Sequence, residues 1–144
     1  MEQLFNFLGF FTGSILLGAM LFFSSLVAPM IFMKLDSVSA GKFIRSIFPH
    51  YYTCIIILSL ISAGFLAPNS QTPSIMIGLV FLLGLISRQI LMPRINSYRD
   101  AEIAGDERAK ILFDRLHQLS VWINVSQLTL LIGALVVLVV ASLQ

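Results

Sequence analysis

The sequence predicts an all-α integral membrane protein, a bundle of four helices that each cross the bilayer. Of its 144 residues, 58% are hydrophobic and 11% are charged, whereas soluble domains average about 45–50% apolar and 25% charged residues. Four long segments carry almost no charge, and about 20 apolar residues suffice for a spanning helix. What remains of the chain is too short to bury four such segments in a soluble core. We expect one domain, 1–144, with spans at about 7–33, 49–67, 75–93 and 119–142.

The composition and motifs exclude several classes of protein. A single cysteine, Cys54, cannot form an internal disulfide or a thiolate metal cluster, and we expect it to be a buried, inert packing residue. The net charge of +2 is too small for a general nucleic-acid binder. The sequence contains no phosphate-binding glycine loop, no serine-hydrolase elbow and no zinc-protease motif. These observations favour a protein that is not an enzyme.

The first span combines an uncharged run of residues with a pattern of small residues. Gly9 and Gly13 form a GxxxG pattern, and Ser14 and Gly18 repeat the same spacing. Small residues at this spacing let helix backbones approach each other closely in a membrane. We expect these four residues to mediate helix packing, either within the bundle or between two copies of the chain.

The connection to the second span has helical periodicity of its own. Apolar residues between Val38 and Tyr51 recur on one face, which predicts an amphipathic helix at the membrane interface. Asp36 or Ser37 is placed to cap it. Pro49 then ends this helix or begins the second span.

The third and fourth spans are expected to project beyond the membrane. The charged stretch between them keeps one apolar helical face, so both helices should continue to a turn at Ala104–Asp106, with Asp106 capping the fourth. Pro93 should kink the third helix. The two pairs of spans follow the same course, but their connecting sequences do not match, so no internal repeat is predicted.

Basic residues indicate how the bundle lies in the membrane. All nine Lys and Arg residues fall between spans one and two, between spans three and four, or, for Arg88, just inside the end of span three. Basic residues near span ends remain on the cytoplasmic side. We therefore expect both termini on the non-cytoplasmic side, in what is most simply a bacterial inner membrane.

The fourth helix carries a polar stripe. His117, Ser120, Asn124 and Gln127 follow one another at intervals of three, four and three residues, so they share one helical face. Polar side chains are costly in hydrocarbon, and this face should therefore turn toward the bundle interior. The stripe fits either interhelical hydrogen bonding or the lining of a functional cavity.

The two histidines suggest a cofactor site. His50 begins the second span and His117 precedes the fourth, at similar depths. Together they could ligate haem iron, with Arg88 near a propionate, or one of them could hold copper with a methionine. Interfacial histidines are also common for purely amphipathic reasons.

Several sequence elements carry a family resemblance: Ser25–Phe32, Phe48–Tyr52, Leu91–Asn96 and Phe113–Ser120. With these elements the chain resembles the transmembrane-protein-205-like family, four-helix membrane proteins related to copper-resistance-D-like and haem-binding protoporphyrinogen-oxidase-like proteins. The resemblance implies a compact membrane bundle and no settled activity. Its eukaryotic relatives are associated with drug and metal-complex resistance. His50 occupies a variable position of the second element.

Three functions remain open from the sequence. The first is a non-enzymatic bundle that either serves as an accessory subunit of a membrane assembly or handles a small solute at its polar stripe. The second is a haem or copper protein using His117 with His50 or a methionine. The third is an uncoupled channel or exporter. No Asp or Glu lies deep in a span, and that disfavours a proton- or sodium-coupled transporter.

Overall fold

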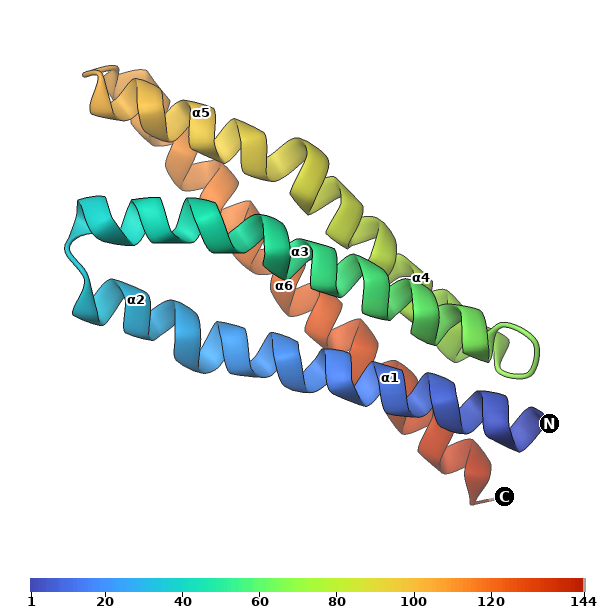
Figure 1. Ribbon diagram of the computed structural model, residues 1–144. Coiled ribbons are helices and arrows are strands. Elements are labelled where there is room, and N and C mark those ends of the chain that lie inside the picture. Colours follow the sequence, from blue (N-terminus) through green and yellow to red (C-terminus); the bar gives the residue numbers. More distant parts are fainter. Residues whose placement is uncertain (144) are drawn as a thin grey trace.

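The computed structural model describes residues 1–143, and it is all helical over that range, without strands. The first long helix comprises α1 (Glu2–Phe22), a π-helical segment (Phe23–Val27) and α2 (Ala28–Lys34), and the second is α3 (Ser37–Leu66). The third comprises α4 (Gln71–Ile86), a π-helical segment (Ser87–Leu91) and α5 (Met92–Ile103), and the fourth is α6 (Glu107–Ser142) (Figure 1).

All four long helices have the length and apolarity that a membrane span requires. They contain 33, 30, 33 and 36 residues, well above the roughly 20 that cross the hydrocarbon layer. Their outward faces are rich in exposed Leu, Ile, Val and Phe, which suits contact with lipid. The predicted four-span membrane fold is confirmed, and the third and fourth helices extend past the predicted spans.

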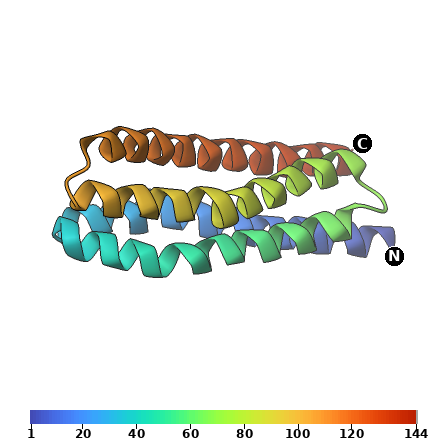
Figure 2. The same ribbon diagram turned by 90° about the horizontal axis from the view of Figure 1, so that it is seen from above.

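The helices run antiparallel and close into a bundle. Around the bundle, α1 packs on α3, α3 on α4, α4 on α6 and α6 on α1. Both chain ends lie at one end of the bundle, and the α2–α3 and α5–α6 turns lie at the other (Figure 2). All nine Lys and Arg residues belong to the half with these two turns. We call that half the basic end and the other the terminal end.

Both turns at the basic end finish with an aspartate that caps the next helix. The Asp36 carboxylate accepts hydrogen bonds from the amides of Val38 and Ser39, each at 3.0 Å. Asp106 accepts in the same way from the second and third residues that follow it. Gly105 precedes it with φ of 98°, a conformation that glycine adopts without strain. The predicted caps are confirmed.

The segment between the first two spans differs from the expected interfacial helix. It continues into the second span as the single helix α3, with Pro49 inside it. Phe48 precedes the proline and Tyr51 follows it, and both rings pack on Phe23, at centroid distances of 5.5 and 4.1 Å. One partner ring thus packs on both sides of Pro49, where α3 continues through a proline that interrupts the backbone hydrogen bonds of a helix.

Two other prolines explain the π-helical segments. Pro29 and Pro93 each follow the last residue of such a segment by two positions. A proline ring clashes with the carbonyl of the residue four positions earlier, here Ser25 and Gln89. Widening the preceding turn relieves this clash. The kink expected at Pro93 therefore takes the form of a π turn, and the first helix contains a matching one.

The two helical hairpins repeat one packing pattern, which the sequence did not predict. Buried positions of the first helix recur in the third 64 residues later. The pairs are Gly9 and Pro73, Gly13 and Ile77, Leu16 and Val80, Met20 and Gly84, and Phe23 and Ser87. Buried positions of α3 recur in α6 72 residues later. These pairs are Ile55 and Gln127, Ser59 and Leu131, Ser62 and Ala134, and Leu66 and Leu138. Burial therefore recurs at the same helical spacing in both hairpins.

Candidate functional site: a polar cluster between the two hairpins

Polar side chains gather inside the bundle at the level of the two π turns. They come from four different helices, two in each hairpin. We call them the polar cluster: Ser24, Tyr51, Ser87, Asn124 and Gln127. Elsewhere the core is built mainly of Leu, Ile, Val, Ala and Met. A concentration of polar groups in an otherwise apolar membrane interior is a default candidate for a functional site.

Asn124 joins the two hairpins with both ends of its amide. Its Nδ2 donates to the Tyr51 hydroxyl at 2.9 Å, and its Oδ1 accepts from the Ser24 hydroxyl at 3.0 Å. Ser24 lies in the first π turn and Tyr51 on α3, so one side chain of α6 binds both helices of the other hairpin. Tyr51 is held in place by stacking on Phe23.

Gln127, one turn along α6, is only partly satisfied. Its side chain is fully buried, and Nε2 donates to the Val80 carbonyl at 3.0 Å. Its Oε1 accepts no hydrogen bond from any residue in the range 1–143. Gly84 lies beside the amide, and a Cβ there would be in ordinary contact with Nε2, at 3.7 Å, but would crowd Ile55 and Ile56, at 3.2 and 3.3 Å. A buried acceptor without a donor costs about 1–3 kcal/mol.

Ser87 carries the second unsatisfied group. It begins the second π turn and is 1% exposed. No hydrogen bond of ordinary geometry reaches its hydroxyl from the described residues, but the hydroxyl of the buried Tyr52 lies close enough to interact with it. Ser87 stands one turn from Gly84 on the face of α4 that receives Gln127. The second hairpin thus brings a spare donor and a spare acceptor to the same region.

The cluster is chemically neutral. It consists of hydroxyls and amides, which donate and accept hydrogen bonds, and none of its members is a carboxylate, an amine or an imidazole. At the positions of Ser87 and Gln127, the first hairpin has the apolar Phe23 and Ile55. The polar residues of the second hairpin at these two positions therefore have no counterparts in the first hairpin.

The predicted stripe on α6 enters the bundle only in part. Gln127 is buried, Asn124 and Ser120 are half-buried, and His117 is exposed. The Ser120 hydroxyl donates to the His117 carbonyl at 2.6 Å instead of reaching a neighbouring helix. The His117 ring stacks on Phe113, one turn earlier on α6, at 5.9 Å. Near its start α6 packs against α5, which leaves the outer half of the stripe uncovered.

The histidines do not form a buried axial pair. His50 is exposed like His117, and its Nδ1 lies 3.0 Å from the Ser46 carbonyl. An axial haem pocket needs both rings directed into an enclosed space. In the part of the chain that the structure describes, no three His, Cys, Asp or Glu side chains gather as metal ligands would. The exposed histidines therefore do not fit an enclosed bis-histidine haem site, and the copper site with a methionine stays a prediction.

Arg88 and Cys54 also lie differently from the expectation. Arg88 is half-buried in the second π turn and forms no ion pair with any residue of 1–143. Asp114, an acidic residue near the start of α6, pairs with Lys110 at 3.4 Å. Cys54 is exposed on the outer face of α3, not buried as predicted. It therefore offers a single native thiol outside the core.

The small residues of α1 divide into two groups. A Cβ on Gly9 would lie 2.5 Å from Leu66, and one on Gly13 would lie 3.1 Å from Leu135, so both glycines contact neighbouring helices of the same chain. Ser14 is half-buried and bonds back to the carbonyl four residues earlier. Gly18 is exposed, with nothing within 4 Å of its Cβ position among the described residues. Of the four small residues, Gly9 and Gly13 are therefore the ones at which helices contact each other closely.

Two cluster residues were not singled out in the sequence. Ser24, which is followed by Ser25, and Ser87 are serines in apolar spans, a common and uninformative feature. Their spacing from proline could have identified them: Ser24 lies five residues before Pro29, and Ser87 lies six residues before Pro93. That spacing places both in the π turns, which are frequent at functional sites.

Comparison with known proteins places the chain in a family. Residues 11–103 match the model of a domain of unknown function, DUF4149. The chain belongs to the DUF4149 family. It is similar to an uncharacterized protein of Aquifex aeolicus (strain VF5), with 32% identity over 127 residues, 88% of this chain and 90% of that protein. No solved structure matches. The DUF4149 match contains Ser24, Tyr51 and Ser87, and α6 lies beyond it.

Proposed function

We propose that this protein is a non-enzymatic membrane protein that binds a small, uncharged polar solute in the polar cluster between its hairpins. The observation that carries the proposal is the pair of buried, unpartnered groups, the Ser87 hydroxyl and Gln127 Oε1. A solute with a hydroxyl or amide group would accept from the first and donate to the second. Its binding would remove two desolvation penalties that the apo protein bears.

The place of the cluster in the fold supports this function. Binding sites in many transporters lie at the interface of structural repeats, where spanning helices are interrupted. Here the cluster lies between two helical hairpins and includes one residue from each π turn. Local breaks in helical geometry give a solute access to groups that a regular helix would occupy.

A path from the basic end is the shortest route to the cluster. Beyond the π turns α5 packs on α6, whereas α2 makes only a slight contact with α3 and none of note with α6 (Figure 1). An ion pair between Arg45 and Asp100 joins the hairpins on the α3–α5 side. The Ser24–Asn124 bond is the hydrogen bond that joins α6 to the first helix within residues 1–143. We infer that solute passes between α2 and α6.

The orientation of the bundle sets which compartment supplies the solute. Basic residues stay on the cytoplasmic side of a membrane, so the basic end would face the cytoplasm and both termini would lie outside. In a bacterial inner membrane the solute would then come from the cytoplasm.

Cysteine accessibility tests the proposal. In a Cys54→Ala background, Ser87→Cys and Ser24→Cys each place one thiol in the cluster, and Ala134→Cys places one in the fully buried apolar core as a control. A small, membrane-impermeant methanethiosulfonate should modify the two cluster thiols and leave the control thiol intact. Glycerol or urea at high concentration should slow the modification. Cluster thiols as inert as the control would contradict the proposal.

Purification separates this function from the other candidates. The proposal expects a colourless protein that retains its fold without a partner in mild detergent. A Soret or copper absorbance band that disappears in His117→Ala would instead favour the redox protein. Stoichiometric copurification of other membrane subunits would favour the accessory role, and solute flux through proteoliposomes would favour the channel or exporter.

A further inference from the structure

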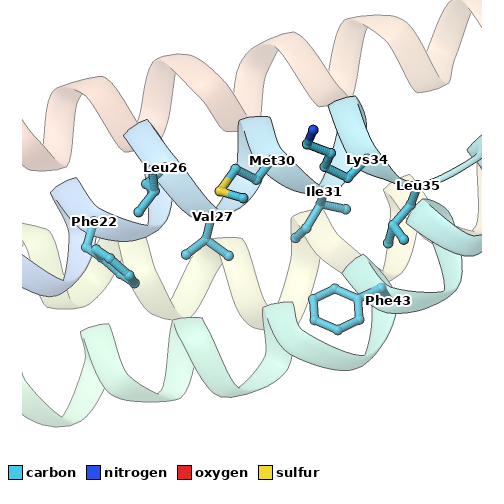
Figure 3. Close-up of a pocket in the computed structure, with 8 residues that line it drawn as sticks. All are labelled: Phe22, Leu26, Val27, Met30, Ile31, Lys34, Leu35 and Phe43. Atoms are coloured by element: carbon cyan, nitrogen blue, oxygen red, sulfur yellow. The ribbon is translucent and has the colours of Figure 1, made fainter.

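A groove runs along the first hairpin, away from the polar cluster. It has a volume of about 340 Å³ and lies between the outer face of α2 and the first turns of α3 (Figure 3). Seven of its eight lining residues are apolar, and the eighth is Lys34. Phe22 lies at one end of the groove, and Lys34 and Leu35 lie at the other, next to the α2–α3 turn.

The break in the first helix explains why the groove exists. The π turn and Pro29 redirect α2, so it makes only a slight contact with α3 compared with α1. Phe43 of α3 lies across from Ile31 of α2 and closes the groove near the turn. Large apolar residues such as Phe22 and Met30 remain exposed along its edge.

We propose that this groove binds one acyl chain of an anionic phospholipid, with the phosphate group at Lys34. The thirteen residues from Phe22 to Lys34 span about 18 Å of helix, close to the roughly 15 Å of hydrocarbon in one leaflet. An apolar groove of that length, open to the lipid side, suits an acyl chain lying along α2. The charge at only one end gives the lipid a direction, with its headgroup at the basic end.

The charges around the mouth favour an anionic headgroup. Lys34 ends α2, and in Figure 3 its side chain turns back along the helix, with the amine above Ile31 on the side away from Phe43. Lys42 is exposed and directly precedes the groove residue Phe43. The carboxylate of Asp36, the acidic residue of this turn, is engaged by the first amides of α3. Basic pockets beside spanning helices recognise anionic lipid headgroups.

Fluorescence quenching by brominated lipids tests this inference. A Trp122→Phe, Phe22→Trp variant carries its only tryptophan in the groove. The wild-type protein carries its only tryptophan, Trp122, on the lipid-facing side of α6, at a similar depth, because the neighbouring Asn124 bonds to Ser24. Both are reconstituted in vesicles that contain equal fractions of brominated phosphatidylglycerol or brominated phosphatidylcholine.

The groove tryptophan should show a preference for the anionic lipid of about fivefold in relative association, the effect of one lysine near the membrane surface. Trp122 should show none. Adding Lys34→Gln should abolish the preference while overall quenching persists. A second probe, Met30→Trp, should reproduce the result if Phe22→Trp disturbs the groove. Equal quenching by the two lipids at both groove probes, or a preference that survives Lys34→Gln, would overturn the inference. The test does not depend on the polar cluster.

Discussion

The Nδ2 of Asn124 donates to the Tyr51 hydroxyl at 2.9 Å, across the boundary between the two hairpins. The same amide accepts from Ser24, so one residue of the second hairpin holds both helices of the first. This contact lies where each hairpin has a π turn and where two buried groups lack partners. The contact that joins the hairpins and the residues of the candidate site therefore lie at the same level of the bundle.

The Asn124–Tyr51 pair should couple the hairpins energetically. Tyr51→Phe and Asn124→Leu each remove one side of the hydrogen bond, and their combination removes both. We expect a coupling free energy of about 0.6–1.7 kcal/mol, the range measured for hydrogen bonds between membrane helices. A double-mutant cycle from detergent unfolding measures it. Strictly additive effects of the two substitutions would show that the bond does not join the hairpins.

We expect Gln127→Leu to abolish solute binding without lowering the stability of the protein. The substitution loses the bond to the Val80 carbonyl but also removes a buried acceptor without a donor. We expect the free energy of unfolding to stay the same or rise by about 1 kcal/mol, while solute no longer protects Ser87→Cys from modification. Leu131→Gln, one turn further along α6 in the apolar core, is the control and should destabilise. A large loss of stability in Gln127→Leu would mean that its amide is fully satisfied.

The two glycines of α1 that contact other helices should respond differently from Gly18. Gly9→Ala places a methyl group against the side chain of the fully buried Leu66, and overpacking of this kind costs about 1–3 kcal/mol. Gly18→Ala meets nothing within 4 Å in the described chain and should be neutral or slightly stabilising. Unfolding in mixed micelles compares the two. If oligomeric state changed while monomer stability did not, the glycines would serve a dimer contact instead.

Each hairpin has packing of its own, so we expect the two hairpins to assemble when they are expressed as separate chains. Cutting the chain within the Ala67–Ser70 turn breaks one short connection at the terminal end and leaves the α1–α3 and α4–α6 packing within each fragment. Coexpressed fragments should copurify and regain the cysteine accessibility pattern of the intact protein. Each fragment keeps its own capped turn, at Asp36 or Asp106. Failure to copurify, with both fragments present in the membrane, would contradict independent hairpins.

The Asp36 cap should make the first hairpin sensitive to acid. Hydrogen bonds, first from the Ser39 side chain and then from backbone amides, hold the pKa of Asp36 below its ordinary value. A carboxyl whose pKa falls on folding adds stability that is present above its unfolded pKa and is lost as pH falls through the folded pKa. Asp36→Asn should therefore flatten the fall in stability below about pH 4. An unchanged pH profile of unfolding would contradict this role.

The sequence predicted the spans and the turns well because these depend on local chemistry. Length and apolarity determine a spanning helix, and Asp36 and Asp106 cap helices through bonds to residues two and three positions away. We did not predict the recurring pattern of buried positions, because equivalent positions in the two hairpins hold different residue types. Gly9 and Pro73, or Met20 and Gly84, are equivalent in position and unlike in chemistry.

The site was harder to predict because it depends on contacts between distant helices. Which serine of a span faces inward depends on the π turn before Pro29 or Pro93, which shifts the helical phase by a residue. The stripe on α6 correctly pointed to Asn124 and Gln127. His117 lies on the same face but beyond the level where the first hairpin covers α6, so its helical position alone did not reveal its exposure.

The most direct test is the rate at which Ser87→Cys, in the Cys54→Ala background, reacts with an impermeant thiol reagent in sealed vesicles of each orientation. We predict rapid modification when the reagent meets the basic end, slow modification when it meets the terminal end, and no modification of Ala134→Cys from either side. Unreactive Ser87→Cys in both orientations, in a folded protein, would contradict a solute site between the hairpins.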